Sequence, residues 1–166
     1  MMTADGFRNE VLGVIRRWEL RGLPPRWTLI NTLKELKKRR DTVVASLFES
    51  PPLILTATLD DGWGVGIEVI HAACDVLGIP YVFLGLIVSP EVIIRKCEEL
   101  RPGVLGLTVL HESSLMDLKS LDQNLPENVL ILVGGMWIDC REFSRRLKYL
   151  KNVLDFMKFF LEPPGK

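Results

Sequence analysis

Apolar runs and amphipathic stretches alternate along the chain from about residue 50 onward, and this alternation constrains the fold more than any other feature. The runs are apolar on both faces, which is typical of parallel strands that helices cover. The expected strands are 53–58, 81–84, 104–110 and 129–133. Consecutive strand–helix units imply right-handed crossovers. The sequence therefore predicts an α/β fold with a parallel sheet of four to five strands.

The helices between these strands are predicted from apolar spacing and from residues that favour helix ends. The first, over 66–77, stops at Gly78, which suits the left-handed conformation that often follows a helix. The second begins at Ser89-Pro90-Glu91, which combines an N-cap, a proline at the first helical position and an acid in the first turn. With helices expected on both faces, the sheet is predicted to be doubly wound and flavodoxin-like, that is, Rossmann-like.

The last two helices are predicted from capping boxes, in which two residues three apart bond reciprocally to each other's backbone. Ser114 with Asp117 has this spacing, and so does Asp139 with Glu142. We therefore expect a third helix from Ser114 and a fourth from Asp139 to about residue 150. Residues 152–161 are expected to add a fifth strand, although their apolar spacing also fits a helix, and the sequence leaves this choice open.

The pattern changes at Pro51-Pro52. Residues 1–49 are predicted to form a short helical segment, and residues 50–166 the α/β domain. A chain of 166 residues is long enough for one well-buried core and too short for two full domains.

Composition and charge exclude several classes of function. Lys plus Arg number 21, as do Asp plus Glu, so no global field favours nucleic acid or an anionic membrane. No apolar run approaches the roughly 20 residues that a membrane-spanning helix needs, and the N-terminus lacks a secretory pattern. Cys74, Cys97 and Cys140 are widely spaced and odd in number, which favours reduced core cysteines over disulfides. We expect a cytoplasmic protein.

The stretch from Leu59 to Gly66 is a glycine-rich turn after the first strand, where a parallel sheet places its ligand. From Asp60 it matches D-x-G-x-G-x-G, which resembles the S-adenosylmethionine-binding turn of methyltransferases. From Asp61 it reads D-x-W-x-x-G, which resembles the D-x-H-x-x-G of cobalamin-binding domains with the histidine replaced. The other strand ends have to discriminate between these two interpretations.

The second strand argues against the methyltransferase interpretation. Such enzymes carry an acid at the end of that strand to bind the ribose of the cofactor, whereas here Gly85 and apolar residues follow it. A dinucleotide-binding turn also fails, because G-x-G-x-x-G from Gly62 requires a glycine where the chain has Ile67. The S-adenosylmethionine interpretation is therefore the weaker of the two.

Residues from about 53 to 150 resemble the cobalamin-binding domain of corrinoid methyl carriers, methionine synthase and cobalamin-dependent mutases. The similarity lies in the order and spacing of short signals at successive strand ends. These signals are the turn with Asp61 and Gly66, Gly85 before Ser89-Pro90-Glu91, Thr108-Val109-Leu110 in place of S-x-L, and the pair Gly134-Gly135. Residues 7–48 share a weaker similarity with part of the helical cap that precedes this domain in methyl carriers.

The resemblance implies a corrinoid cofactor and a set of residues that contact it. These cofactor-binding residues are Asp61, Trp63, Gly66, Gly85, Thr108, Leu110, Gly134 and Gly135. In the family, glycines let the backbone approach the nucleotide tail of the corrinoid, and a hydroxyl at the position of Thr108 bonds to the base of that tail. No catalytic residue and no metal ligand is predicted in the chain.

Trp63 stands where the family has the histidine that ligates cobalt from below, and an aspartate at the position of Asp61 orients that histidine. The indole nitrogen is a donor without an available lone pair, so it cannot bind a metal. Two outcomes are open. Either Trp63 lies beneath a corrinoid that is bound base-off without a protein histidine, or Trp63 and Trp137 fill the cleft and no corrinoid binds. His111, after the third strand, is interpreted as a loop residue rather than a cobalt ligand.

The resemblance thus implies a corrinoid carrier or accessory subunit that presents the cofactor to a partner methyltransferase or mutase, with methyl transfer as the expected chemistry. The cofactor would hold the reactivity while the protein positions and shields it, so no stand-alone activity is expected. The alternative is a structural or regulatory protein of the same fold that binds no cofactor, and the third interpretation is an S-adenosylmethionine-dependent methyltransferase. No nucleic-acid or membrane partner is expected, and the oligomeric state is left open.

Overall fold

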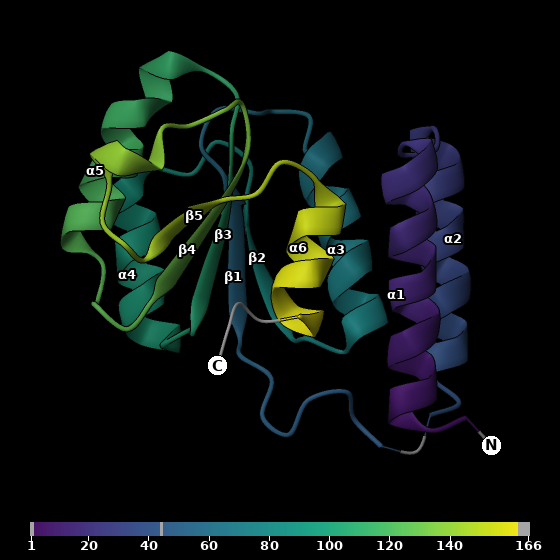
Figure 1. The fold of residues 1–166 in the computed structure, drawn as a ribbon. Coiled ribbons are helices and arrows are strands. Elements are labelled where there is room, and N and C mark those ends of the chain that lie inside the picture. Colours follow the sequence, from purple (N-terminus) through teal and green to yellow (C-terminus); the bar gives the residue numbers. More distant parts are fainter. Residues whose placement is uncertain (1, 44, 163–166) are drawn as a thin grey trace. The chain divides into compact units, whose positions relative to one another are not determined.

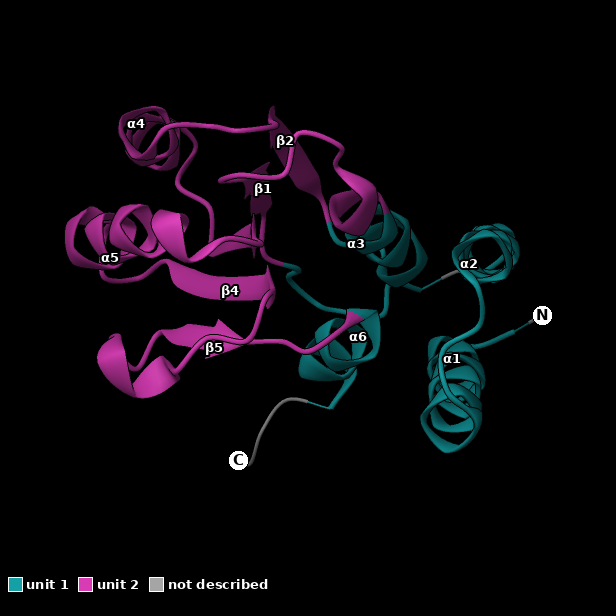
Figure 2. Cartoon of the chain, turned by 90° about the horizontal axis from the view of Figure 1, so that it is seen from above, with its two compact units in different colours: residues 1–51, 69–79, 153–166 teal, residues 52–68, 80–152 magenta. Residues whose placement is uncertain are grey.

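The computed structural model describes residues 2–43 and 45–162. The chain divides into two compact units, which Figure 2 colours separately. The first unit comprises the described residues of 1–51, 69–79 and 153–166, and the second comprises 52–68 and 80–152. Helix α3 (Val65–Leu77) begins in the second unit and continues in the first. The division between residues 49 and 50 stays a prediction.

The second unit is built on a five-stranded parallel sheet, which confirms the predicted doubly wound, flavodoxin-like α/β fold (Figure 1). The strands are β1 (Ile54–Thr58), β2 (Tyr81–Gly85), β3 (Val104–Val109), β4 (Leu130–Gly135) and β5 (Leu147–Tyr149). Their order is β2-β1-β3-β4-β5, so the chain reverses its progress across the sheet after β2. Open parallel sheets bind ligands beyond the carboxyl ends of the strands at such a reversal, which here lies between β1 and β3.

One face of the sheet packs against helices α4 (Pro90–Leu100) and α5 (Leu115–Asn124), which lie on the same side of it in Figure 1. Alternate strand residues supply this core, because successive side chains of a strand point to opposite faces. The core includes Leu55, Ala57, Leu105, Leu107, Val109, Ile131, Val133 and Leu147 from the strands and Ile93, Cys97, Leu118 and Leu121 from the helices. Each fully buried large aliphatic side chain stabilises the fold by roughly 1.5–3 kcal/mol.

The intervening positions near the carboxyl ends of β1, β3 and β4 are small or carry hydroxyls. They are Thr56, Thr58, Gly106, Thr108 and Gly134. The register pairs Thr58 with Thr108 and Thr108 with Gly134. Two threonines and a glycine therefore lie side by side on three neighbouring strands.

The helix predicted from Asp139 to about residue 150 is wrong. Only a short 3-10 turn, η2 (Cys140–Glu142), follows Asp139, whose carboxylate accepts the backbone N–H of Arg141 at 3.1 Å. Hydrogen bonds from the Arg141 side chain, and then from its backbone, lower the pKa of the Asp139 carboxyl to about 2. The capping signal therefore operates on a single turn.

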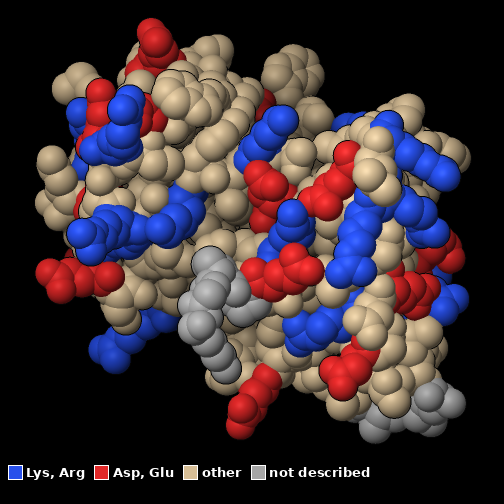
Figure 3. Space-filling model, viewed as in Figure 1, with Lys and Arg blue, Asp and Glu red and all other residues tan. Residues whose placement is uncertain are grey.

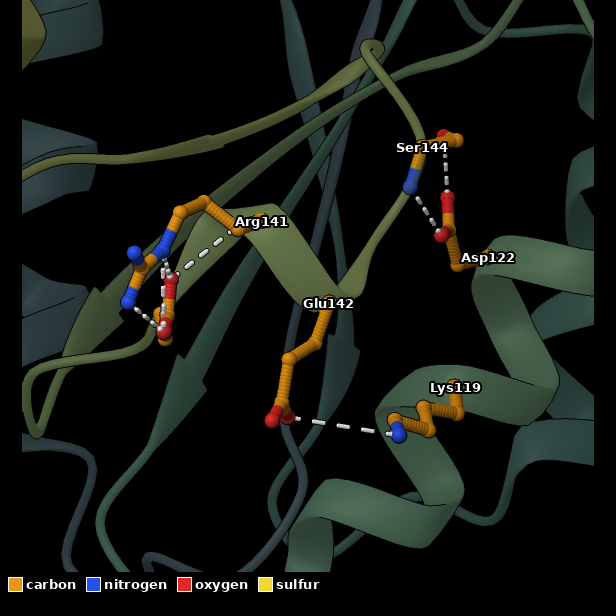
Figure 4. Close-up of polar contacts among 6 residues, drawn as sticks. Lys119, Asp122, Arg141, Glu142 and Ser144 are labelled. Carbon is orange, nitrogen blue, oxygen red and sulfur yellow. Dashed lines mark hydrogen bonds and ion pairs between the residues drawn. The ribbon is translucent and has the colours of Figure 1, made fainter.

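Contacts with α5 explain why the helix stops and the chain becomes extended (Figure 4). The Ser144 N–H and hydroxyl donate to the two carboxylate oxygens of Asp122, at 2.7 and 2.5 Å. Arg146 donates to backbone carbonyls after α5, including that of Leu125 at 3.2 Å. The segment held in this way forms β5, where Leu147 is buried. Bonds between residues more than twenty positions apart override the local signal.

Two further predictions differ from the structure. The Ser114–Asp117 capping box does not form, because Ser114 ends a 3-10 turn, η1 (Glu112–Ser114), and its side chain makes no capping hydrogen bond to α5. The tail, which is expected to add a strand but whose apolar spacing also fits a helix, forms helix α6 (Val153–Leu161), and its buried residues have helical spacing. The fifth strand is β5.

The first unit contains α1 (Ala4–Arg21) and α2 (Arg26–Arg40), so the predicted N-terminal helical segment is present as two helices. Thr3 caps α1 by accepting the Gly6 N–H at 3.0 Å. Arg8 of α1 donates to the carbonyls of Leu47 at 2.7 Å and Leu161 at 3.1 Å. One side chain thus ties together three segments of this unit that are far apart in the sequence.

Basic side chains of α2 lie beside acidic ones. Lys38 pairs with Glu35 at 2.8 Å, and Arg39 pairs with Glu10 of α1 at 2.6 Å. On the face drawn in Figure 3, basic and acidic side chains are also interspersed over the α1 region. This arrangement does not favour a phosphate-binding surface on α2, because the positive charge is locally compensated.

The cysteines at positions 74 and 97 are buried free thiols, and burial raises the pKa of Cys74 to about 12 and that of Cys97 to about 11. Both thiols are therefore protonated at neutral pH, which makes them poor nucleophiles. None of the helices in the described ranges is both long enough and apolar enough to cross a bilayer.

Candidate functional site

The carboxyl ends of the strands bring the predicted cofactor-binding residues to one edge of the sheet. Asp61, Trp63 and Gly66 follow β1, and Leu110 follows β3. The register pairs Ala57 with Gly85, Thr58 with Thr108, Thr108 with Gly134 and Val109 with Gly135. All the predicted residues belong to the second unit, so this site is described within one compact body.

The turn after β1 satisfies its own polar groups. The Thr58 hydroxyl donates to the carbonyl of Asp61 at 2.7 Å and accepts the N–H of Ile87 at 2.9 Å. Asp61 is buried, and its Oδ1 accepts the backbone N–H of Trp63 at 2.8 Å. The Asp61 carboxylate therefore orders the backbone of the turn. In the cobalamin-binding domains that the sequence resembles, the aspartate at this position orients a histidine side chain instead.

Asp60 is a site residue that sequence reasoning missed. Its Oδ1 accepts the Leu110 N–H at 2.9 Å, and its Oδ2 accepts the His111 N–H at 2.8 Å. One carboxylate therefore fixes the loop after β3 to the turn after β1. Two consecutive acids in a glycine-rich turn were visible in the sequence, but their partners fifty residues away were not.

Thr108 differs sharply from Thr58, its neighbour across β1 and β3. Thr108 is only 8% exposed as a residue, and its hydroxyl forms no hydrogen bond with the residues that the structure describes. The hydroxyl oxygen itself is not fully buried, because Glu10 Oε2 is the only fully buried side-chain oxygen or nitrogen without a partner among these residues. A hydroxyl that bonds to no described group can donate a hydrogen bond to a ligand or accept one from it.

The three predicted glycines of β4 and α3 have different structural requirements. A Cβ on Gly135, at φ +108°, would lie 2.2 Å from the carbonyl oxygen of Val109, so the fold itself requires glycine there. A Cβ on Gly134 would meet only the carbonyl oxygen of Leu150, at 3.6 Å, which is an ordinary contact. For Gly66, the described chain places no atom within 4 Å. Packing therefore does not explain glycine at 134 or 66.

Large apolar side chains surround these strand ends and are exposed. Trp63 is 87% exposed and Trp137 is 69% exposed, so neither indole is buried in the sheet as the cleft-filling interpretation requires. Together with Leu86, Ile87 and Leu110, which are also exposed, they form what we call the strand-end rim. Exposed apolar groups gathered around one edge are typical of a ligand or partner surface.

Within the described residues, no group of three or more His, Cys, Asp or Glu side chains could hold a metal ion. His111 is exposed after β3, and Asp60 holds its backbone N–H. The donors present at this edge are a hydroxyl and backbone groups next to apolar side chains. That set suits a large organic ligand with a few polar atoms better than a bare cation.

No protein-family model and no curated protein matches the sequence. Solved structures match its fold. A novel cobalamin-binding protein from Desulfitobacterium hafniense DCB-2 has a TM-score of 0.77 and 18% identity, over 98% of this chain and 82% of the other. The Methanosarcina barkeri monomethylamine corrinoid protein has a TM-score of 0.63 and 20% identity, over 78% of this chain and 62% of the other.

A third similar structure is the methanol:cobalamin methyltransferase complex from Methanosarcina barkeri. One of its chains has a TM-score of 0.66 and 16% identity, over 98% of this chain and 67% of the other. Similarity at these identities shows a common fold. The chain therefore has the same fold as solved cobalamin-binding and corrinoid proteins.

Proposed function

We propose that this protein binds a cobalamin-type corrinoid at the carboxyl ends of β1, β3 and β4 and presents it to a partner enzyme. The observation that supports this most is the hydroxyl of Thr108, a mostly buried residue, which bonds to no described group and lies beside Gly134, at the switch point of a doubly wound sheet. The names of the three similar structures, which refer to cobalamin or corrinoid binding, point to the same class of ligand.

The nucleotide tail of the corrinoid is proposed to lie against Thr108, Gly134 and Gly66. The Thr108 hydroxyl would supply a hydrogen bond to the base of the tail. The positions that a Cβ would occupy at Gly134 and Gly66 are free of close contacts with the described chain. The residues therefore fit a ligand that approaches the backbone closely, because a side chain at either position would compete with it. Gly135 is proposed to have a structural role, because a residue with a Cβ at this position would clash with the Val109 carbonyl.

The corrin ring is proposed to lie over the strand-end rim. Trp63 offers a flat apolar surface, since an indole buries about 150–250 Å² when covered. It has no lone pair for cobalt, and Asp61 is already bonded to its backbone N–H. We therefore propose a base-off corrinoid without a histidine ligand from the turn. Cobalt, when bound, would supply the site that accepts and releases a methyl group, while the rim positions the ring.

The partner is proposed to be a methyltransferase or mutase, with methyl transfer as the leading reaction. The support is the similar chain from a methanol:cobalamin methyltransferase complex. The exposure of Trp63 and Trp137 fits a surface that a bound ring covers first and a partner approaches next.

Reconstitution with hydroxocobalamin tests the proposal. The protein is mixed with excess ligand, freed of unbound ligand by gel filtration, and examined by visible absorption and cobalt analysis. We expect retained colour at equimolar cobalt and protein, with a base-off spectrum. A colourless protein fraction would overturn corrinoid binding. A calorimetric signal with S-adenosylmethionine in that same preparation would then favour a methyltransferase.

Two glycine variants locate the bound ligand. Gly134→Leu places a side chain where the tail is proposed to lie, and we expect it to abolish retained colour. Gly13→Leu is the matched control, because a Cβ at Gly13 of α1 also meets no described atom within 4 Å. We expect Gly13→Leu to retain the colour of the wild type. Thermal unfolding of both variants checks that each remains folded.

A further inference from the structure

Ile87 has a backbone conformation that is unusual for its type. Its φ is +53°, in the left-handed region. A β-branched residue with positive φ is a genuine outlier, because its Cβ crowds the backbone. Among the described residues other than glycine, Arg101, with φ +48° at the C-terminal cap of α4, is the only other with positive φ. Position 87 therefore holds a residue that its own backbone disfavours.

Neighbouring groups hold this conformation from several sides. The Ile87 N–H donates to Thr58 Oγ1, and the Val88 N–H donates to the Thr58 carbonyl, both at 2.9 Å. The Cδ1 atom of Ile87 lies 3.4 Å from where a Cβ on Gly62 would be. The loop after β2 is thus fastened to the turn after β1, and the strained residue cannot relax without breaking these bonds.

Burial does not compensate for this strain. Ile87 is 63% exposed, so the fold gains little from burial of this residue. Strained residues that the surrounding structure enforces occur mainly at binding and active sites. An exposed isoleucine in a strained, fastened loop on the strand-end rim has the properties of a ligand contact.

We propose that Ile87 is a contact residue for the corrin macrocycle, and this inference rests on the proposed function. The side chain presents an apolar surface at the rim, and the ring covers it when bound. The contact is with the macrocycle rather than with the nucleotide tail, because Thr108 and Gly134, where the tail is proposed to lie, are on β3 and β4, beyond β1 from this loop. Ile87 and Thr108 should therefore respond to different parts of the ligand.

The test compares two corrinoids on the full chain. Hydroxocobalamin carries the nucleotide tail, and dicyanocobinamide lacks it. Ile87→Asn removes the apolar contact and substitutes a residue that tolerates positive φ. We expect it to weaken both ligands by a similar factor, on the order of tenfold, as loss of a buried aliphatic contact implies. We also expect its melting temperature to equal or exceed that of the wild type.

Three further variants separate strain from contact. Ile87→Gly repeats the test with another residue that accepts this φ, and the same loss of affinity is expected. Arg101→Gly relieves the other strained position, so its melting temperature should not fall and neither affinity should change. Thr108→Val should weaken hydroxocobalamin and leave dicyanocobinamide unaffected.

The outcomes separate this inference from the proposal it rests on. If the wild type binds neither corrinoid, the proposed function fails and this inference with it. If the wild type binds both and the Ile87 variants bind them as tightly, only the inference on Ile87 is overturned. A loss restricted to hydroxocobalamin would also overturn it, because that result places Ile87 against the tail.

Discussion

Two neighbouring regions at the carboxyl edge of the sheet treat their polar groups in opposite ways. In the turn after β1, the Thr58 hydroxyl and the carboxylates of Asp60 and Asp61 all bond to backbone groups of the protein. At the ends of β3 and β4, the Thr108 hydroxyl has no partner among the described residues, and Gly134 carries no side chain. The two threonines lie side by side on adjacent parallel strands.

This difference separates residues that hold the fold together from residues that we propose contact a ligand. Groups already satisfied within the protein contribute to stability, and their removal leaves buried partners unsatisfied. Groups that bond to nothing in the described chain contribute little to its stability and can bond to a ligand. Substitutions of Thr58, Asp60 and Asp61 should therefore lower stability, whereas substitutions of Thr108 and Gly134 should lower affinity.

The largest effect on stability is expected at Gly135, the β4 glycine that the fold itself requires. Gly135→Ala forces a Cβ against the Val109 carbonyl at a φ of +108°, and we expect a loss of more than about 3 kcal/mol in the free energy of unfolding. Gly66→Ala is the control, since its Cβ would meet no described atom within 4 Å. Urea unfolding measures both, and equal stability of the two variants would contradict the distinction.

The next largest effect is expected for Thr58→Val. The variant keeps the shape of the side chain but leaves the Asp61 carbonyl and the Ile87 N–H without their partner. We expect a loss of about 2–3 kcal/mol, measured by chemical denaturation. A variant as stable as the wild type would show that water replaces the hydroxyl, and the two threonines would then not differ in the way described.

A smaller loss is expected when the link between the two regions is cut. Asp60→Ala removes the acceptor of the Leu110 and His111 N–H groups, and we expect a loss of about 1–2 kcal/mol, because water can reach this half-buried carboxylate. Asp60→Asn retains one acceptor oxygen and should lose less. Amide hydrogen exchange should show faster exchange at residues 110 and 111, and unchanged exchange there would contradict the linking role.

The smallest change in stability, with a clear change in binding, is expected for Thr108→Val. No described group loses a hydrogen bond, so the free energy of unfolding should stay within about 0.5 kcal/mol of the wild type or rise. The affinity for hydroxocobalamin should fall about tenfold, equivalent to about 1.4 kcal/mol. If unfolding is markedly easier and binding is unchanged, the roles assigned to Thr58 and Thr108 would be reversed.

Much of the fold was predictable because local signals agree with tertiary packing in the strands up to β4 and in helices α3 and α4. The exception was the segment after Asp139, where the capping pattern is local but Asp122 and Arg146 bond across more than twenty residues. The C-terminal tail had apolar spacing that suited two structures, and only its packing selects the helix.

The site was predictable to the level of which loops form it. Strand ends in a parallel sheet meet at one edge whatever their sequence, so Thr108 and Gly134 could be placed together in advance. The role of Asp60 could not be, because its partners are backbone groups fifty residues away. The positive φ of Ile87 could not be predicted from its residue type either, because this conformation depends on bonds to Thr58.

Equilibrium dialysis of the wild-type protein against increasing hydroxocobalamin, with cobalt measured on both sides of the membrane, tests most directly whether the carboxyl ends of β1, β3 and β4 bind a corrinoid. We expect saturation at a one-to-one ratio of cobalt to protein. Equal cobalt concentrations on the two sides at every ligand concentration would contradict corrinoid binding and would leave the unpartnered Thr108 hydroxyl to a different ligand.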